Sequence, residues 1–138
     1  VLGDAVNLAS RLEGQSGNYG MQIILGEETI KKISKDEYLQ FELDLISVKG
    51  KSEPTSIFTV FKSWTAEVAY EVFYEEHMDF LKNYRSKNWD KAKQHIDKYR
   101  LSMPEFTLYY TLFLNRIDEL SKQSLPEDWS GIFAAETK

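Results

Sequence analysis

Residues 38–61 read YLQFELDLISVKGKSEPTSIFTVF, and this stretch decides the fold of the first half of the chain. Phe41, Leu43 and Leu45 alternate with acidic residues, and this two-residue period is typical of a strand with one solvent-facing side. A polar segment with Gly and Pro follows at 49–54, and a second apolar run comes directly after it. The stretch therefore predicts a β-hairpin.

Upstream of the hairpin, the sequence predicts one more strand and two helices. Residues 21–25 form an apolar run between glycines, which is typical of a short buried strand. Residues 26–33 place glutamates first and lysines last, an order that suits the dipole of a short helix. Asp4 is a good N-cap for a first helix. The apolar stripe of that helix consists of Val6, Ala9 and Leu12.

Downstream of residue 62 the character of the chain changes to all-helical. No glycine occurs between Ala66 and Lys122, and apolar residues repeat at helical spacing. Three helices are predicted, with breaks near Ser86 and Ser102, and Pro104 suits the first turn of the third. Their apolar faces are Ala69, Val72, Phe73, Phe80, Leu81 and Tyr84; Trp89, Ala92, Ile96 and Tyr99; and Phe106, Tyr109, Phe113, Ile117 and Leu120.

The pattern thus indicates an α+β protein with two parts. Residues 1–62 form a mixed part, and residues 66–138 form a helical extension with a C-terminal tail. The spacing of Ala92, Ile96 and Tyr99 before Pro104 resembles the second half of a tetratricopeptide repeat, although such arrays need about three units to bury a continuous core.

Composition excludes several classes of protein. The chain has 138 residues, no cysteine and a formal net charge of −5. Without cysteine there is no disulfide framework and no thiolate metal site. A negative net charge argues against binding nucleic acid, and no apolar run is long enough for a membrane span, so neither contact is expected of this segment. We expect a cytoplasmic protein, and the sequence leaves open whether its parent is membrane-anchored.

The candidate site residues are two histidines, one lysine in the hairpin turn and one asparagine–arginine pair. His77 and His95 lie on separate predicted helices without metal-ligand spacing, and we expect them to be surface or partly packed residues. Lys49 stands beside a glycine in the hairpin turn, where a lysine serves either solubility or phosphate binding. Asn7 and Arg11 are four residues apart on one helix face, which indicates either a solvated face or a site.

Two longer motifs favour the interpretation of Asn7, Arg11 and Lys49 as site residues. The string from Gly3 to Glu13, GDAVNLASRLE, strongly resembles the signature helix of class III adenylate and guanylate cyclases. The later string VKGKSEP followed by IFTV resembles the end of the same catalytic domain. Residues 126–133 resemble the C-terminal ends of some bacterial cyclases that carry a helical tail.

This resemblance implies a fold, a reaction and roles for single residues. The fold would be a truncated ferredoxin-like cyclase half, and the reaction would convert ATP to cyclic AMP and pyrophosphate in signal transduction. Asn7 matches the asparagine that orients the ribose, and Arg11 matches the arginine that stabilises charge on the α-phosphate. Lys49 matches the lysine that contacts the terminal phosphates. The backbone of Val1 and Leu2 would line the base pocket.

The resemblance also implies what the intact protein needs in addition. The resemblance implies a homodimer with its active sites between the subunits. Each site would bind two Mg²⁺ or Mn²⁺ ions through aspartates that would lie upstream of Val1. Asp4 is interpreted as a helix cap. ATP is expected ahead of GTP because adenylate cyclases are the more frequent members. We expect this chain to be a piece of a longer protein and to be inactive alone. The alternative is a regulatory pseudo-cyclase whose helical tail binds a protein partner.

Overall fold

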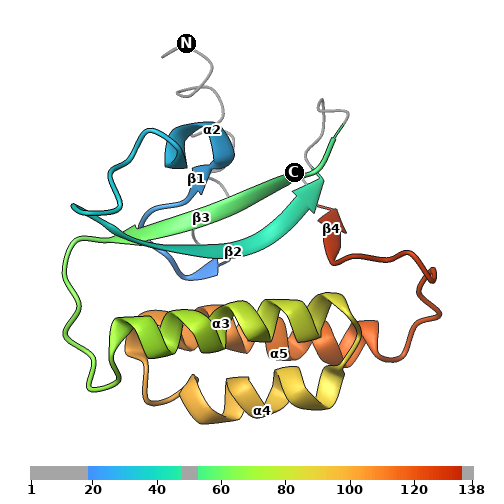
Figure 1. Cartoon of the computed structure of the whole chain (residues 1–138). Coiled ribbons are helices and arrows are strands. Elements are labelled where there is room, and N and C mark those ends of the chain that lie inside the picture. The colour runs from blue at the N-terminus through green and yellow to red at the C-terminus, as the bar shows by residue number, and fades with distance from the viewer. Residues whose placement is uncertain (1–18, 48–52, 135–138) are drawn as a thin grey trace. The chain divides into compact units, whose positions relative to one another are not determined.

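The computed structural model describes residues 19–47 and 53–134, and these form two compact units. The first unit contains the described residues between 22 and 65 together with 132–134. The second contains 19–21 and 66–131. Figure 1 shows a sheet in the first unit and a helical bundle in the second, so the class is α+β as the sequence predicts.

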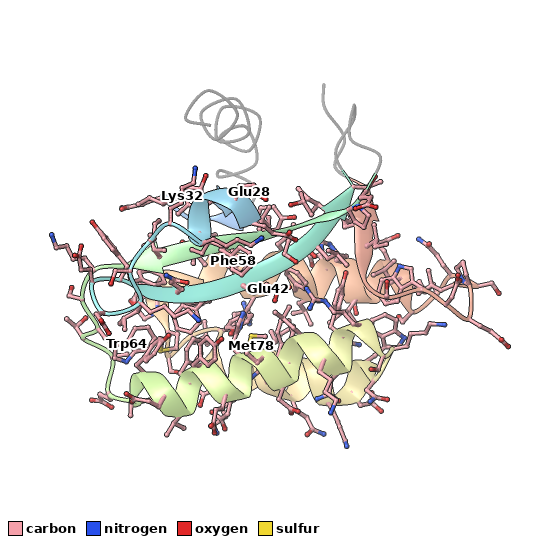
Figure 2. The ribbon with its side chains drawn as sticks, turned by 45° about the horizontal axis from the view of Figure 1, so that its top comes forward. Glu28, Lys32, Glu42, Phe58, Trp64 and Met78 are labelled. Atoms are coloured by element: carbon pink, nitrogen blue, oxygen red, sulfur yellow. The ribbon has the colours of Figure 1, made fainter. Side chains whose placement is uncertain are left out.

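The first unit is built on the predicted hairpin. Strand β2 (Leu39–Ser47) pairs antiparallel with β3 (Thr55–Phe61), which confirms the prediction for residues 38–61. Glu42 and Phe58 are partners in this register, and Figure 2 shows their side chains next to each other on the sheet. The register shifts after Glu42, where a bulge lets β2 bend.

Two short strands complete a mixed sheet in the order β1-β3-β2-β4. Strand β1 (Leu25–Gly26) pairs antiparallel with β3, and β4 (Ile132–Ala134) pairs parallel with β2. The sequence pattern did not predict the pairing of β4, because a strand of three residues has no readable period.

The prediction of a strand over 21–25 is wrong for most of its length, since only Leu25 belongs to β1. The pairing ends at Gly26 because helix α2 (Glu27–Ile30) begins at once. A Glu27 carboxylate oxygen accepts a hydrogen bond from the Ser56 backbone N–H at 2.8 Å and fixes this helix start beside β3. Helix α2 is also shorter than predicted, and Lys31 and Lys32 fall in the turn that follows it.

The core of the first unit is mainly aliphatic, and an aromatic cluster around Phe41 lies beside it. Phe41 is fully buried, and its ring centroid lies 5.9 Å from that of Phe61 and 5.7 Å from that of Trp64. Rings at these separations attract each other beyond the effect of area burial alone. Trp64 thus anchors the segment that leaves β3 on the sheet.

The second unit confirms the three predicted helices. They are α3 (Tyr70–Arg85), α4 (Trp89–Tyr99) and α5 (Thr107–Leu120), and a 3₁₀ turn over Pro104–Phe106 leads into α5. Glu71 and Asp90 stand in first turns and Lys82 and Lys98 in last turns, an arrangement that favours both helix dipoles. Figure 1 shows α3 and α4 as a hairpin.

The core of the helical unit is mainly aromatic, and it differs from the predicted faces at two positions. Val72 is 51% exposed and Ala69 precedes α3 as its N-cap, so neither belongs to the buried stripe. The stripe begins one turn later, at Phe73. The buried residues of the three helices are Phe73, His77, Phe80, Leu81 and Tyr84; Ala92, Ile96 and Tyr99; and Tyr109, Tyr110, Phe113, Arg116 and Ile117.

Candidate functional site

The residues that the sequence assigns to catalysis and substrate binding lie outside the described residues. They are Val1, Leu2, Asn7, Arg11 and Lys49. Their roles therefore stay predictions. Residues 48–52, which include Lys49, connect β2 to β3, and the pairing of these strands runs up to Ile46 and Thr55.

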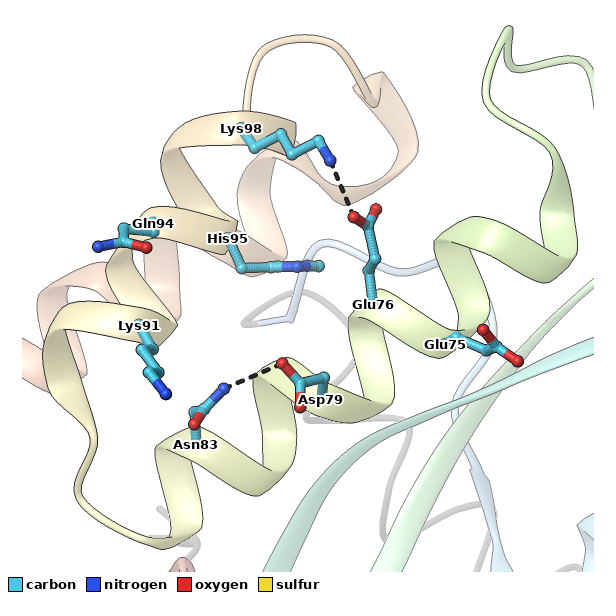
Figure 3. A pocket seen from close by; sticks show the side chains of 8 residues that line it. All are labelled: Glu75, Glu76, Asp79, Asn83, Lys91, Gln94, His95 and Lys98. Carbon is cyan, nitrogen blue, oxygen red and sulfur yellow. Dashed lines mark hydrogen bonds and ion pairs between the residues drawn. The ribbon is translucent and has the colours of Figure 1, made fainter.

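The helical unit contains a polar groove between α3 and α4. Its volume is about 540 Å³. Figure 3 shows the lining side chains, and they come from both helices: Glu75, Glu76, Asp79 and Asn83 from α3, and Lys91, Gln94, His95 and Lys98 from α4. One wall is thus mainly acidic and the other mainly basic.

Polar contacts inside the groove join these two walls. The Lys98 ammonium lies 2.8 Å from a carboxylate oxygen of Glu76, and the Tyr99 hydroxyl donates a hydrogen bond to the other oxygen. On α3, the Asn83 amide donates to the Asp79 carboxylate at 3.1 Å. One ion pair thus joins the two walls, and one hydrogen bond engages the Asp79 carboxylate.

Behind this groove, two histidines share the hydroxyl of Tyr110. His77 Nδ1 lies 2.9 Å and His95 Nε2 lies 2.7 Å from Tyr110 Oη. A hydroxyl carries one proton, so it donates to one ring and accepts an N–H from the other. His77 is fully buried, and the prediction of a surface or partly packed residue is wrong for it. It fills a core position because Tyr110 satisfies its ring nitrogen.

Burial sets the ionisation of this cluster. It lowers the pKa of His95 from 6.5 to about 3, with smaller contributions from the nearby His77 and Lys98 charges. Burial, assisted by Glu76, raises the pKa of the Tyr110 hydroxyl well above 10.0. Both groups are therefore neutral near pH 7, where neither is tuned for proton transfer.

The described residues of the groove and of the histidine cluster do not form a metal site. Among residues 19–47 and 53–134, no group of three or more His, Asp or Glu side chains is placed to hold a metal ion. The sequence did not predict the cluster, because His77, His95 and Tyr110 stand on three different helices and no short motif joins them. A polar ligand could bind the groove, but the described residues there indicate no reaction.

Comparison with known proteins gives a more specific result. The chain is 42% identical over 62 residues to an adenylate cyclase of Anabaena cylindrica. It is 44% identical over 61 residues to the terminal-differentiation-specific adenylate cyclase of Dictyostelium discoideum. Part of this chain is related to adenylate cyclases.

Each match covers less than half of this chain and a small part of the adenylate cyclase. They span 44% and 43% of this chain, but only 12% of the Anabaena protein and 3% of the Dictyostelium protein. No protein-family model matches the chain, and no solved structure matches it. In the part of the chain that the structure describes, no helix is long and apolar enough to cross a membrane.

Proposed function

We propose that this chain is part of an adenylate cyclase, an enzyme that converts ATP to cyclic AMP and pyrophosphate in signal transduction. One observation carries the proposal: identity of 42–44% over about 60 residues to two proteins named adenylate cyclase. Both cyclase motifs stand in residues 1–62. We assign this segment to the C-terminal half of a class III catalytic domain.

Within that segment we assign the chemistry to Asn7, Arg11 and Lys49. In the transfer of a phosphoryl-type group, the protein contributes mainly positioning and charge stabilisation. Arg11 offers a planar, permanently charged set of donors that matches phosphate oxygens, and it would stabilise the α-phosphate as the ribose 3′-hydroxyl attacks. Asn7, one helical turn before Arg11, would hold the ribose, and Lys49 would contact the departing phosphates. The backbone of Val1 and Leu2 would line the base pocket.

We assign metal binding to aspartates upstream of this chain. Two Mg²⁺ or Mn²⁺ ions, when bound, would supply positive charge to the triphosphate. The intact enzyme would be a homodimer in which one subunit supplies these aspartates and its partner supplies Asn7 and Arg11. The isolated chain would then be inactive.

An activity assay of an upstream-extended protein tests this proposal. The extended protein and the present chain are incubated with manganese and either ATP or GTP, and cyclic nucleotide is quantified. We expect cyclic AMP from the extended protein and no product from the present chain. Cyclic nucleotide from the present chain would contradict the predicted inactivity. If the extended protein folds and dimerises but makes no product, the chain belongs to a regulatory pseudo-cyclase.

A further inference from the structure

One face of the α3–α4 hairpin carries two rows of side chains with opposite charge, and we call these rows together the charged face. Within each row the members are three or four residues apart, so they lie on one side of their helix. The rows are Val72, Glu76, Asp79 and Asn83 on α3, and Lys91, Gln94, Lys98 and, directly after the helix, Leu101 on α4. The charged and amide members line the groove (Figure 3), and the whole face belongs to the helical unit.

The charges of this face are only partly paired within the chain. Lys98 and Glu76 form an ion pair at 2.8 Å, and their side chains are 59% and 35% exposed. Among the described residues, the Lys91 side chain forms no ion pair or hydrogen bond. The Asp79 carboxylate likewise forms no ion pair there and accepts one hydrogen bond, from Asn83. Each row therefore keeps one charge without a counter-charge, an anion on α3 and a cation on α4.

Two exposed apolar side chains continue the rows toward one end of the hairpin. Val72 is 51% exposed and Leu101 is 75% exposed. Because α3 and α4 run in opposite directions, the contact between Glu76 and Lys98 sets which residues lie level with each other. Val72 stands four residues before Glu76, and Leu101 stands three residues after Lys98, so both lie about one turn further toward the same end. A partner that covers this end removes apolar surface from water.

A second copy of the chain is complementary to this face. About a twofold axis parallel to the two helices, α3 of one copy faces α4 of the other at the same level, and each acidic row meets a basic row. Glu76 then lies level with Lys98 of the partner subunit, and Val72 lies level with Leu101 of the partner subunit. A twofold axis across the helices would instead set like charges against each other, which is unfavourable.

We propose that the charged face is an interface between two copies of the helical unit, related by a twofold axis parallel to α3 and α4. Asp79 stands about one turn along the axis from the partner subunit's Lys91, a separation that a lysine side chain spans. Both charges thus gain the counter-charge that they lack within their own chain. The interface is small and polar, so its Kd is on the order of 100 μM and rises with salt. It is separate from the catalytic dimer proposed above.

Sedimentation of the full chain and of two charge-reversal variants tests the proposal. Asp79→Lys brings cations together across the interface, and Lys91→Glu brings anions together, so each variant alone should dimerise about tenfold more weakly than the wild type. In an equal mixture, opposite charges face each other again, and dimerisation should return to about the wild-type strength. Glu105→Lys makes the same charge change as Asp79→Lys outside the charged face, and it should sediment like the wild type. A wild-type chain that is monomeric at about 300 μM, or a mixture no stronger than its components, would overturn the proposal.

Disulfide trapping tests the geometry independently of any other contact between chains. The chain has no cysteine, so Val72→Cys and Leu101→Cys each introduce a single thiol, at an exposed position. We expect mild oxidation of an equal mixture to give the mixed disulfide dimer well above its statistical share, as measured by mass spectrometry. A statistical mixture, or a preference for dimers of one variant, would overturn the twofold arrangement.

Discussion

Replacing Tyr110 with Phe removes the hydroxyl that pairs with a fully buried ring nitrogen of His77 and with a half-buried ring nitrogen of His95. The hydroxyl lies 2.9 Å from His77 Nδ1 and 2.7 Å from His95 Nε2. Tyr110 and His77 have no exposed surface, and the Phe80 and Phe106 rings lie 5.4 Å and 5.6 Å from that of Tyr110. The surroundings of His77 are therefore aromatic, and its lost partner is not readily replaced by water, whereas His95 lines the groove between α3 and α4, where water replaces the lost partner.

The expected cost follows from these two contacts. A buried polar group that loses its partner costs about 1–3 kcal/mol. This cost applies in full to His77 and only in part to His95, so we expect a destabilisation of about 1–3 kcal/mol. Urea unfolding followed by the helical circular dichroism signal measures this change. The same substitution at Tyr74, whose side chain is 37% exposed, is the control and should change stability by less than about 0.5 kcal/mol. A Tyr110→Phe chain as stable as the control would refute the reasoning.

Three further predictions concern the stability of the helical unit. The pKa of His95 is about 3 in the folded chain and 6.5 in the unfolded chain. Between these two pH values the unfolded chain binds one more proton than the folded chain, so the folded chain loses stability as the pH falls from 6.5 toward 3. Urea unfolding at several pH values should show the wild type losing about 1 kcal/mol per pH unit relative to His95→Gln, and parallel pH profiles would contradict this. Gly20→Ala should lower the free energy of unfolding of the chain by about 2 kcal/mol, because Gly20 has a φ of +68° and a Cβ there would lie 2.3 Å from Leu108 Cβ. Thermal unfolding measures this change, and an unchanged Tm would contradict it. Lys98→Ala should lower the free energy of unfolding by less than about 1 kcal/mol, because the ion pair between Lys98 and Glu76 is exposed to solvent. Urea unfolding measures this change, and a larger loss would contradict the exposed position of the pair.

The elements that the sequence predicts well are those with a local pattern. The hairpin follows from the alternation around Phe41 and from the polar turn. The helical faces follow from residues such as Phe80 and Ile96 that repeat along one helix. The break before α5 follows from Pro104. In each case, neighbours within a few residues carry the information.

The elements that the sequence does not predict depend on contacts between distant residues. Tyr110 is 33 residues from His77 and 15 from His95, so nothing local indicates that they share a hydrogen bond. Strand β4 has three residues, and its pairing depends on the position of Leu45–Ser47 and of the preceding tail. The residues assigned to catalysis differ, because Asn7 and Arg11 stand in one continuous sequence motif, residues 3–13. Both lie outside the described residues, so their roles stay predictions.

We propose that Arg11 belongs to the catalytic machinery of an adenylate cyclase, and the kcat of an upstream-extended protein tests this role most directly. We predict that Arg11→Ala lowers kcat for cyclic AMP formation by about 10²–10³. Lys31→Ala removes the same charge from a side chain that is 70% exposed beyond α2, and it should leave kcat unchanged. An Arg11→Ala enzyme with the same kcat as the Lys31→Ala control would contradict the account.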